Sequence, residues 1–259
     1  LTGRTAIVTG ASKGIGRSIA ELFAARGANV VLGARSAPLL GDVAAGITER
    51  GGVAVEVEVD VMAEDAPGRL VTAAVEAFGG VDILVNNAGG NSFMTPLATM
   101  RFSGWRKTLD LNLDSIVRLI QEALPHLVAS GHGVIVNVSS VTALRGSPLM
   151  AHYGAAKAAL VSLTQSLAIE TAGDGIRVNA LVPGWIATDL TGFLRTDETL
   201  ESHVLDRVPM RRWGTPDEIA QGVLWLASSG SSYVTGTALS VDGGTVALSA
   251  GTNFTDLEP

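Results

Sequence analysis

The stretch Thr9-Gly10-Ala11-Ser12-Lys13-Gly14-Ile15-Gly16 decides the fold of this 259-residue chain. A β-branched run at residues 5–9 leads into its first glycine, and a helical pattern at residues 15–26 begins at its end. Glycine lets the backbone approach a ligand closely, and the N–H groups and dipole at a helix start attract a pyrophosphate. The stretch therefore predicts a strand–loop–helix unit that binds a nucleotide.

Two other interpretations of this loop exist. Its glycine spacing departs from the commonest dinucleotide fingerprint, so a tight turn that binds no ligand is one alternative. Residues 10–14 also match the G-x-S-x-G nucleophile elbow of a serine hydrolase. We set the hydrolase aside because that elbow normally follows several strands, whereas this one follows the first. The chain also has no His-Gly-Gly motif for an oxyanion hole.

Strand and helix patterns alternate along the chain. The strand patterns are nearly continuous in apolar character, which is typical of a parallel sheet buried on both faces. We predict one α/β domain over residues 1–259, a Rossmann fold with a doubly wound seven-stranded parallel sheet and helices on both faces. Strands are expected at residues 5–9, 29–32, 53–59, 83–85, 134–138, 177–181 and 238–241, and helices at 15–26, 39–50, 66–78, 115–127 and 155–169.

Composition excludes several other functions. The chain has 25 acidic and 18 basic residues, a net charge of −7, which disfavours nucleic acid as a partner. It has no Cys, which excludes disulfides, thiolate nucleophiles and Cys-ligated metals, and we predict no metal site. No apolar run approaches the roughly 18 residues of a membrane helix, so no membrane partner is expected. The start at Leu1 has no hydrophobic signal core, and we expect a cytoplasmic protein without a targeting peptide.

The end of the second strand indicates which dinucleotide binds. Enzymes that prefer NAD place a carboxylate there, which accepts hydrogen bonds from the ribose hydroxyls and repels a 2′-phosphate. This chain has Ala34 and then Arg35 at that place, and Lys13 in the glycine loop offers a second cation. Since Arg binds phosphate with two donors, we predict NADP(H) as the cofactor. The alternative is that both cations are solvated surface residues.

Four further motifs follow in order. Asn86-Asn87-Ala88-Gly89 comes after the fourth strand pattern, Asn112 lies in Leu109-Asp110-Leu111-Asn112-Leu113, Ser139-Ser140 ends the fifth strand, and Tyr153 precedes Lys157 by four positions. With the glycine loop, Pro183-Gly184 and Val241-Asp242-Gly243-Gly244, these motifs resemble the short-chain dehydrogenase/reductase family, in its 3-oxoacyl-reductase-like branch, over residues 3–245. The resemblance implies an oxidoreductase with the catalytic tetrad Asn112, Ser140, Tyr153 and Lys157.

The chemistry of these residue types agrees with that role. Tyr153 and Lys157 share one face of a helix, and the cation is expected to lower the phenol pKa from about 10. Tyr153 would protonate a carbonyl oxygen as hydride arrives from the nicotinamide, or take the proton from an alcohol in reverse. Ser140 would hydrogen-bond the same oxygen. The resemblance implies that Lys157 also holds the nicotinamide ribose and that Asn112 positions a water in a proton relay.

The resemblance also implies which residues hold the cofactor. Asp60 would bind the adenine amino group, Asn86 and Gly89 the region of the adenine ribose, and Thr188 the nicotinamide carboxamide. The structural alternatives are that Asp60 caps the loop after the third strand and that Asn86 ties adjacent strands together. The expected set is Gly10, Ser12, Lys13, Gly14, Ile15, Gly16, Arg35, Asp60, Val61, Asn86, Ala88, Gly89, Tyr153, Lys157, Pro183, Gly184, Ile186 and Thr188.

A substrate lid is expected at residues 185–212, where this family places one. Its moderately apolar sequence suggests a medium-sized ketone with few charges, or the corresponding alcohol. Trp185 and Phe193 are alternatively packing anchors, the commoner role of an aromatic residue. The expected substrate contacts are Asn91, Val141, Leu144, Met150, Trp185 and Phe193.

Many relatives reduce 3-oxoacyl groups on acyl carrier protein, and such a reductase, or one acting on a CoA thioester, is the alternative function. The loops expected to flank a carrier, residues 128–133 and 171–175, contain no Lys or Arg, and the chain itself is acidic. We therefore predict an enzyme for a small diffusible carbonyl compound or alcohol, although Arg118 and Arg177 keep the carrier alternative open. The intact tetrad argues against a non-catalytic NADP-binding regulator.

Family members are commonly tetramers built on the helices that contain Asn112 and Tyr153. The helical patterns at residues 115–127 and 155–169 are apolar enough for such an interface, although helices that cover a sheet need the same property. We expect a homotetramer. Residues 245–259 are expected to form a C-terminal tail that either folds over a neighbouring subunit's cleft or is disordered.

Overall fold

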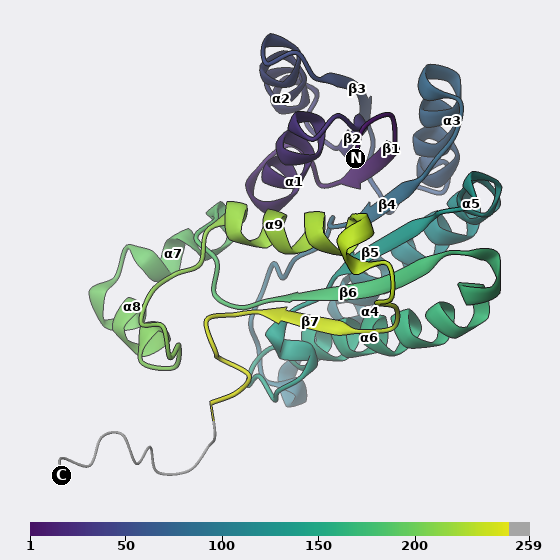
Figure 1. Ribbon diagram of the computed structural model, residues 1–259. Helices are drawn as coiled ribbons and strands as arrows, with labels where there is room; N and C mark the ends of the chain where they lie inside the picture. The colour runs from purple at the N-terminus through teal and green to yellow at the C-terminus, as the bar shows by residue number, and fades with distance from the viewer. Residues whose placement is uncertain (249–259) are drawn as a thin grey trace.

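A computed structural model describes residues 1–248, in which seven parallel strands form one sheet in the order β3-β2-β1-β4-β5-β6-β7 (Figure 1). The strand order reverses between β1 and β4, and α/β proteins bind ligands outside the carboxyl ends of the strands at such a point. The strands are β1 (Thr5–Thr9), β2 (Asn29–Ala34), β3 (Val53–Glu58), β4 (Ile83–Asn86), β5 (Val134–Val138), β6 (Arg177–Pro183) and β7 (Ala238–Val241).

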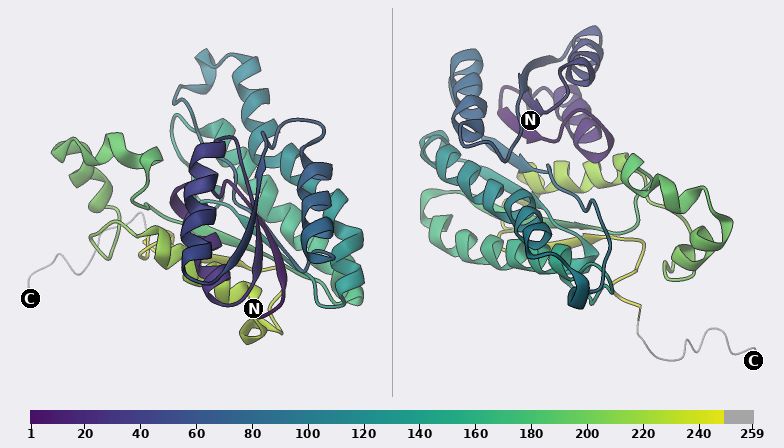
Figure 2. Two further views of the ribbon diagram at one scale, coloured as in Figure 1. Left: turned by 90° about the horizontal axis from the view of Figure 1, so that it is seen from above. Right: turned by 180° about the vertical axis from the view of Figure 1, so that it is seen from behind.

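Helices cover both faces of the sheet (Figure 2). They are α1 (Gly14–Ala25), α2 (Ala37–Glu49), α3 (Ala66–Phe78), α4 (Phe102–Leu109), α5 (Ser115–Ser130), α6 (Ala151–Thr171), α7 (Gly192–Arg195), α8 (Glu198–Leu205) and α9 (Pro216–Ala227). α1, α2 and α9 pack on one face with Ala6 and Val8 of β1, whereas α3, α5 and α6 pack on the other face with Ile7. The predicted Rossmann fold with helices on both faces is confirmed.

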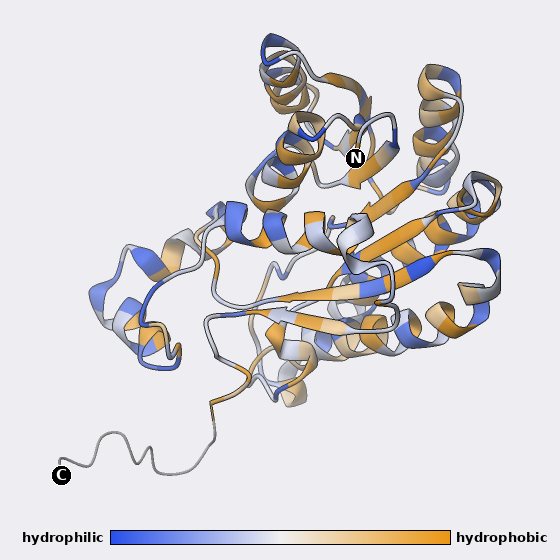
Figure 3. Cartoon of the chain, in the orientation of Figure 1, coloured by the Kyte–Doolittle hydropathy of each residue, from blue (hydrophilic) through white to orange (hydrophobic). Residues whose placement is uncertain are grey.

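The alternation of side chains along β1 explains why a continuous apolar run is needed. Neighbouring residues point to opposite faces, and here both faces are covered by helices. All five residues of β1 are buried. Figure 3 shows β4 and β5 coloured largely as hydrophobic along their length. α7 and α8, which lie in the predicted lid, instead extend away from the sheet (Figure 1).

Several elements differ from the predicted bounds by a few residues. β2 continues to Ala34, which pairs with Glu58, and β6 continues to Pro183, which pairs with β7. α6 begins at Ala151 instead of residue 155, so Tyr153 lies within the helix. The predicted tail at residues 245–259 falls within the described part of the chain only as far as residue 248.

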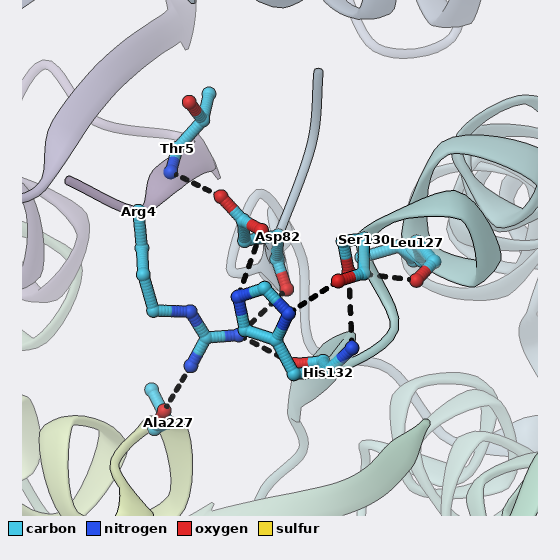
Figure 4. Close-up of polar contacts among 7 residues, drawn as sticks. All are labelled: Arg4, Thr5, Asp82, Leu127, Ser130, His132 and Ala227. Carbon is cyan, nitrogen blue, oxygen red and sulfur yellow. Dashed lines mark hydrogen bonds and ion pairs between the residues drawn. The ribbon is translucent and has the colours of Figure 1, made fainter. Parts of the chain in front are cut away.

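Arg4 ties together the amino edge of the sheet, where the strands begin (Figure 4). Its guanidinium donates hydrogen bonds to the carbonyl oxygens of Ala227 at 3.1 Å, Asp82 at 3.2 Å and His132 at 2.6 Å. The Asp82 carboxylate accepts the Thr5 N–H at 2.7 Å and pairs with the His132 ring at 3.2 Å. Arg4, Asp82 and His132 precede β1, β4 and β5, and Ala227 ends α9, so the Arg4 side chain joins the starts of three strands to a helix.

We predict that Arg4→Met destabilises the protein by about 2–4 kcal/mol, because three carbonyl groups lose their donor together. Arg4→Lys is the matched control and should recover part of the loss, since an ammonium keeps the charge without the fork of donors. Urea unfolding at fixed protein concentration measures both variants. A loss smaller than about 0.5 kcal/mol for Arg4→Met, the usual size at an uninvolved surface position, would contradict this role.

Candidate active site

The glycine loop between β1 and α1 is packed too closely for side chains. Gly10 has φ +67°, and a Cβ on Gly16 would lie 2.2 Å from the Gly10 carbonyl oxygen. Glycine is therefore required at Gly16 for α1 to start directly against the loop. Lys13, at the N-cap of α1, makes no capping hydrogen bond, and the first turn contains no acidic residue. This uncapped helix start fits an anionic pyrophosphate.

Thr9 and Asn87, to which the sequence analysis gave no role, fix this loop to the end of β4. The Thr9 hydroxyl accepts the N–H groups of Asn87 and Ala88, each at 3.0 Å. The Asn87 amide donates to the Thr9 carbonyl oxygen at 2.9 Å. Because β1 and β4 are neighbours at the point where the strand order reverses, these bonds join the two loops that the sequence assigned to the cofactor.

The start of the predicted lid lies beside the glycine loop. A Cβ on Gly14 would lie 3.5 Å from the Thr188 methyl group, so the structure brings these two predicted cofactor residues together. The Lys13 ammonium pairs with the Asp189 carboxylate at 3.3 Å, and both side chains are largely exposed. Such an exposed pair is worth no more than about 1 kcal/mol, so a phosphate can compete with Asp189 for Lys13.

The remaining predicted cofactor residues lie at the same edge, in varied surroundings. Arg35 is exposed directly after β2. Asp60, followed by Val61, accepts the N–H of Met62 at 3.1 Å, and the buried Asn86 donates to Asn137 of β5 at 2.8 Å. These are the contacts of the two structural alternatives, a capped loop and tied strands. Ser12 and Ile15 lie in the glycine loop and the first turn of α1, Pro183 ends β6, Gly184 packs on Asp242, and Ile186 is buried.

Ser140, Tyr153 and Lys157 meet where β5 ends against α6. The Ser140 side chain is close enough to the Tyr153 phenol to act on its pKa, and its hydroxyl accepts the Thr142 N–H at 3.2 Å. The Lys157 ammonium lies 5.8 Å from the centroid of the Tyr153 ring and donates to the Val138 carbonyl oxygen at 2.8 Å. The helix places the phenol and the ammonium on one face, as their spacing predicts.

Burial dominates the acid–base properties of this pair. It raises the pKa of Tyr153 to about 12, an effect that the hydrogen bond from Ser140 only partly offsets. It also lowers the pKa of Lys157, which is 3% exposed, to about 8. The predicted lowering of the Tyr153 pKa is therefore wrong for the protein without cofactor or substrate. At pH 7 Tyr153 is a neutral phenol, the form that donates a proton, and Lys157 is mostly charged.

Asn112 holds the loop after β4 against Lys157. It is fully buried in the π-helical turn Asp110–Asp114, between α4 and α5. Its amide donates to the carbonyl oxygens of Gly90 and Thr108 at 3.0 and 2.9 Å, and its Oδ1 accepts the Gly90 N–H at 2.9 Å. A Cβ on Gly89 would lie 2.8 Å from that Oδ1 and 3.2 Å from the Lys157 Nζ. The amide of Asn112 is thus fully engaged in placing backbone.

The predicted substrate residues divide into two groups. Val141, Leu144 and Met150 lie in the segment between Ser140 and α6, and Asn91 lies in the loop after β4. Trp185 instead packs edge-on against Trp213 at 6.0 Å and lines a cavity of about 120 Å³ that none of the tetrad residues touches. Phe193, on α7, is 58% exposed. The structure therefore places the first group beside the tetrad and Trp185 at a separate cavity.

Arg145 and His152 are two residues near this site whose contacts the sequence did not reveal. Arg145 donates to the carbonyl oxygens of Thr245 and Leu248, which joins the segment after Ser140 to the chain after β7. His152 bonds Asn91 at 2.9 Å. Both contacts join residues far apart in sequence, so no local pattern could have indicated them.

The geometry does not support the serine-hydrolase alternative. Within residues 1–248, the one ion pair between a histidine and a carboxylate is His132–Asp82, at the amino edge of the sheet, whereas Ser12 lies at the carboxyl edge. A serine triad is therefore not assembled there. In the same residues no cluster of His, Asp and Glu could hold a metal. None of the described helices has the length and apolar character needed to cross a membrane.

Comparisons with known proteins find dehydrogenases and reductases among the relatives of this chain. A family model described as enoyl-(acyl carrier protein) reductase matches residues 10–246. The chain is 39% identical over 246 residues to glucose 1-dehydrogenase 2 of Bacillus subtilis, covering 94% of this chain and 95% of that protein. It is 40% identical over 247 residues to a 3-oxoacyl-[acyl-carrier-protein] reductase of Chlamydia trachomatis, covering 94% of this chain and 98% of that one.

A solved structure is also similar to this chain over nearly its whole length. A proposed NAD(P)-dependent gluconate 5-dehydrogenase from Beutenbergia cavernae, with NADP bound at low occupancy, has a TM-score of 0.90 and 39% identity to this chain. The match covers 96% of this chain and 98% of that one. The resemblance inferred from the motifs is confirmed: the chain belongs to the short-chain dehydrogenase/reductase family and is an oxidoreductase that binds a nicotinamide cofactor.

Proposed function

We propose that this enzyme interconverts a ketone and a secondary alcohol on a small diffusible molecule, with NADP(H) as its cofactor. The observation that carries the proposal is the convergence on the neutral phenol of Tyr153 of the Ser140 side chain, which acts to lower the phenol pKa, and of the Lys157 ammonium, 5.8 Å from the centroid of the ring. A proton donor, a second hydrogen-bond donor and a cation thus converge where negative charge develops on a carbonyl oxygen.

Each residue has a distinct part in the proposed reaction. Tyr153 donates its proton to the substrate oxygen during reduction and accepts it back during oxidation. Ser140 donates a hydrogen bond to that oxygen and keeps the substrate in place. Lys157 stabilises the phenolate left on Tyr153, and Asn112 acts by holding Gly90 and the neighbouring Gly89 against Lys157. When bound, the nicotinamide supplies or accepts the hydride at the substrate carbon.

The preference for NADP(H) rests on the residues around the predicted 2′-phosphate site. Arg35 follows β2 directly, is exposed and makes no ion pair within residues 1–248, so its donors are available to a phosphate. Lys13 has a single exposed carboxylate partner, Asp189. The bound NADP in the Beutenbergia cavernae relative supports the same assignment.

A diffusible substrate is favoured over a carrier-bound one. Arg118 pairs with Asp110 at 3.0 Å, and Arg177 donates to the carbonyl oxygens of residues 226, 228 and 234. Both cations that kept the carrier alternative open are therefore engaged within the protein. The relative from Bacillus subtilis is named for a sugar, whereas the Chlamydia trachomatis relative is named for a carrier-bound substrate. We propose a single catalytic domain, a homotetramer and a cytoplasmic location on the sequence pattern alone.

The catalytic role of Tyr153 is tested by Tyr153→Phe. Loss of the phenol proton should lower kcat by about 10²–10⁴-fold, the range for a general acid, while NADPH binding followed by nicotinamide fluorescence changes little. Activity should be measured on a panel of ketones, including 5-ketogluconate and a 3-oxoacyl thioester. Retained turnover in the variant would refute the mechanism, and faster turnover of the thioester than of all free ketones would favour the carrier alternative.

The cofactor preference is tested by the double variant Ala34→Asp, Arg35→Gln. A carboxylate at residue 34 should repel the 2′-phosphate and accept ribose hydroxyls, which shifts the ratio of kcat/KM values from NADPH towards NADH by at least about tenfold. Arg26→Gln, which removes one exposed cation at the carboxyl end of α1, is the control for the loss of the Arg35 charge. An unchanged ratio in the double variant would contradict the assignment.

The buried charge of Lys157 predicts a conflict between activity and stability. Lys157→Met should abolish activity and stabilise the nucleotide-free protein by about 1–3 kcal/mol at pH 7, because burying the ammonium costs free energy. The Lys157 pKa of about 8 lies below the ordinary lysine value of 10.5, so the folded state binds fewer protons than the unfolded state between those values.

This difference in bound protons makes the stability of the wild type depend on pH. As pH rises from about 8 towards 10.5, wild-type stability should rise relative to Lys157→Met, so the advantage of the variant should shrink. Urea unfolding of both proteins at pH 7 and pH 9.5 measures the change. A variant less stable than wild type at pH 7, or an advantage that grows with pH, would contradict the burial cost.

A further inference from the structure

Directly before Tyr153, α6 carries a buried histidine that the proposed mechanism does not use. The His152 side chain is fully buried, and its ring stacks on Phe93 with centroids 4.3 Å apart and planes 15° apart. Phe93 in turn lies against α4, since a Cβ on Gly104 would come within 3.0 Å of its ring. His152 therefore holds the loop after β4 between α4 and α6.

The hydrogen bond of His152 fixes the orientation of a neighbouring amide. Its Nε2 lies 2.9 Å from Oδ1 of Asn91. A carbonyl oxygen only accepts, so Nε2 carries the proton. The other neutral tautomer would place an N–H at Nδ1, which is buried and has no partner within residues 1–248. Burial also lowers the pKa of His152, although a backbone contact with Phe93 opposes this effect, and so favours the neutral ring.

With Oδ1 committed to His152, the NH₂ group is the open end of the Asn91 amide. It donates no hydrogen bond to any residue in the described range, and it is not among the buried atoms that lack a partner. The same loop is tied to the catalytic groups on both sides of Asn91. Gly89 lies against the Lys157 Nζ, and His152 precedes Tyr153. Asn91 thus belongs to the loop that borders Lys157, two residues after Gly89.

We propose that His152 is a positioning residue that aims the Asn91 NH₂ group at the substrate, and that the pair selects ketones and alcohols with an oxygen acceptor next to the reacting carbon. The inference rests on the proposed function and narrows its substrate class to oxygen-rich compounds such as hydroxyketones. A substrate without that oxygen would displace water from the NH₂ group and leave it unpaired, which lowers the relative kcat/KM of that substrate.

The test compares NADPH oxidation with cyclohexanone and with 2-hydroxycyclohexanone. Wild type should prefer the hydroxyketone at least about tenfold in kcat/KM, the effect of one hydrogen bond. His152→Phe keeps an aromatic ring against Phe93 but removes the Nε2 proton, and it should lose the preference through a higher KM for the hydroxyketone. His152→Gln retains a donor amide and should keep part of the preference.

Asn91→Asp provides a second variant, because it replaces the NH₂ group with an oxygen and should lose the same preference. The inference is overturned if His152→Phe or Asn91→Asp keeps the wild-type preference, or if His152→Phe lowers kcat/KM equally for both ketones. Wild type that binds NADPH but turns over neither ketone nor any other carbonyl compound would refute the proposed function, and the inference with it. Turnover without a preference for the hydroxyketone would overturn the inference alone.

Discussion

The buried ammonium of Lys157 is the constraint on which the rest of the active site depends. A charge that is 3% exposed is costly, and within the described residues its one hydrogen bond is to the Val138 carbonyl oxygen. The surrounding backbone is arranged to hold it. Gly89 leaves room for the ammonium, Asn112 clamps Gly90 beside it, and the Ser139 hydroxyl donates to the Lys157 carbonyl oxygen at 2.9 Å. In the proposed mechanism, this destabilising charge lies at the position where it serves the reaction.

The parallel sheet brings these groups together because all its strands end at one edge. β1 delivers the glycine loop, β4 the loop with Gly89, and β5 the segment with Ser140, while α6 returns Tyr153 and Lys157 to the same edge. The amino edge carries a different kind of polar network, in which Arg4 and Asp82 join strands to α9. Contacts that stabilise the sheet and groups that carry the chemistry therefore lie at opposite ends of the strands.

The features of the fold and the site that the sequence predicts correctly are those that depend on local patterns. The glycine loop, the apolar strands and the four-residue spacing of Tyr153 and Lys157 depend on neighbours in the chain, and the fold and the family assignment followed from them. The contacts of Asn87 with Thr9 and of His152 with Asn91 join residues that are 78 and 61 positions apart. Only the tertiary packing determines whether residues so far apart in the sequence form a contact. The expected lowering of the Tyr153 pKa was wrong because the degree of burial is not visible in a motif.

In the proposed mechanism, a neutral Tyr153 phenol donates the proton while a charged Lys157 stabilises the phenolate that is left. The most direct measurement is the single-turnover rate of NADPH oxidation by a saturating ketone between pH 6 and about 10. We predict a rate that is flat at low pH and falls as pH rises through the Lys157 pKa of about 8, because Tyr153 stays protonated throughout this range and the cation is lost. A rate that rises with pH through that value would exclude this mechanism, since it would require a deprotonated group to promote reduction.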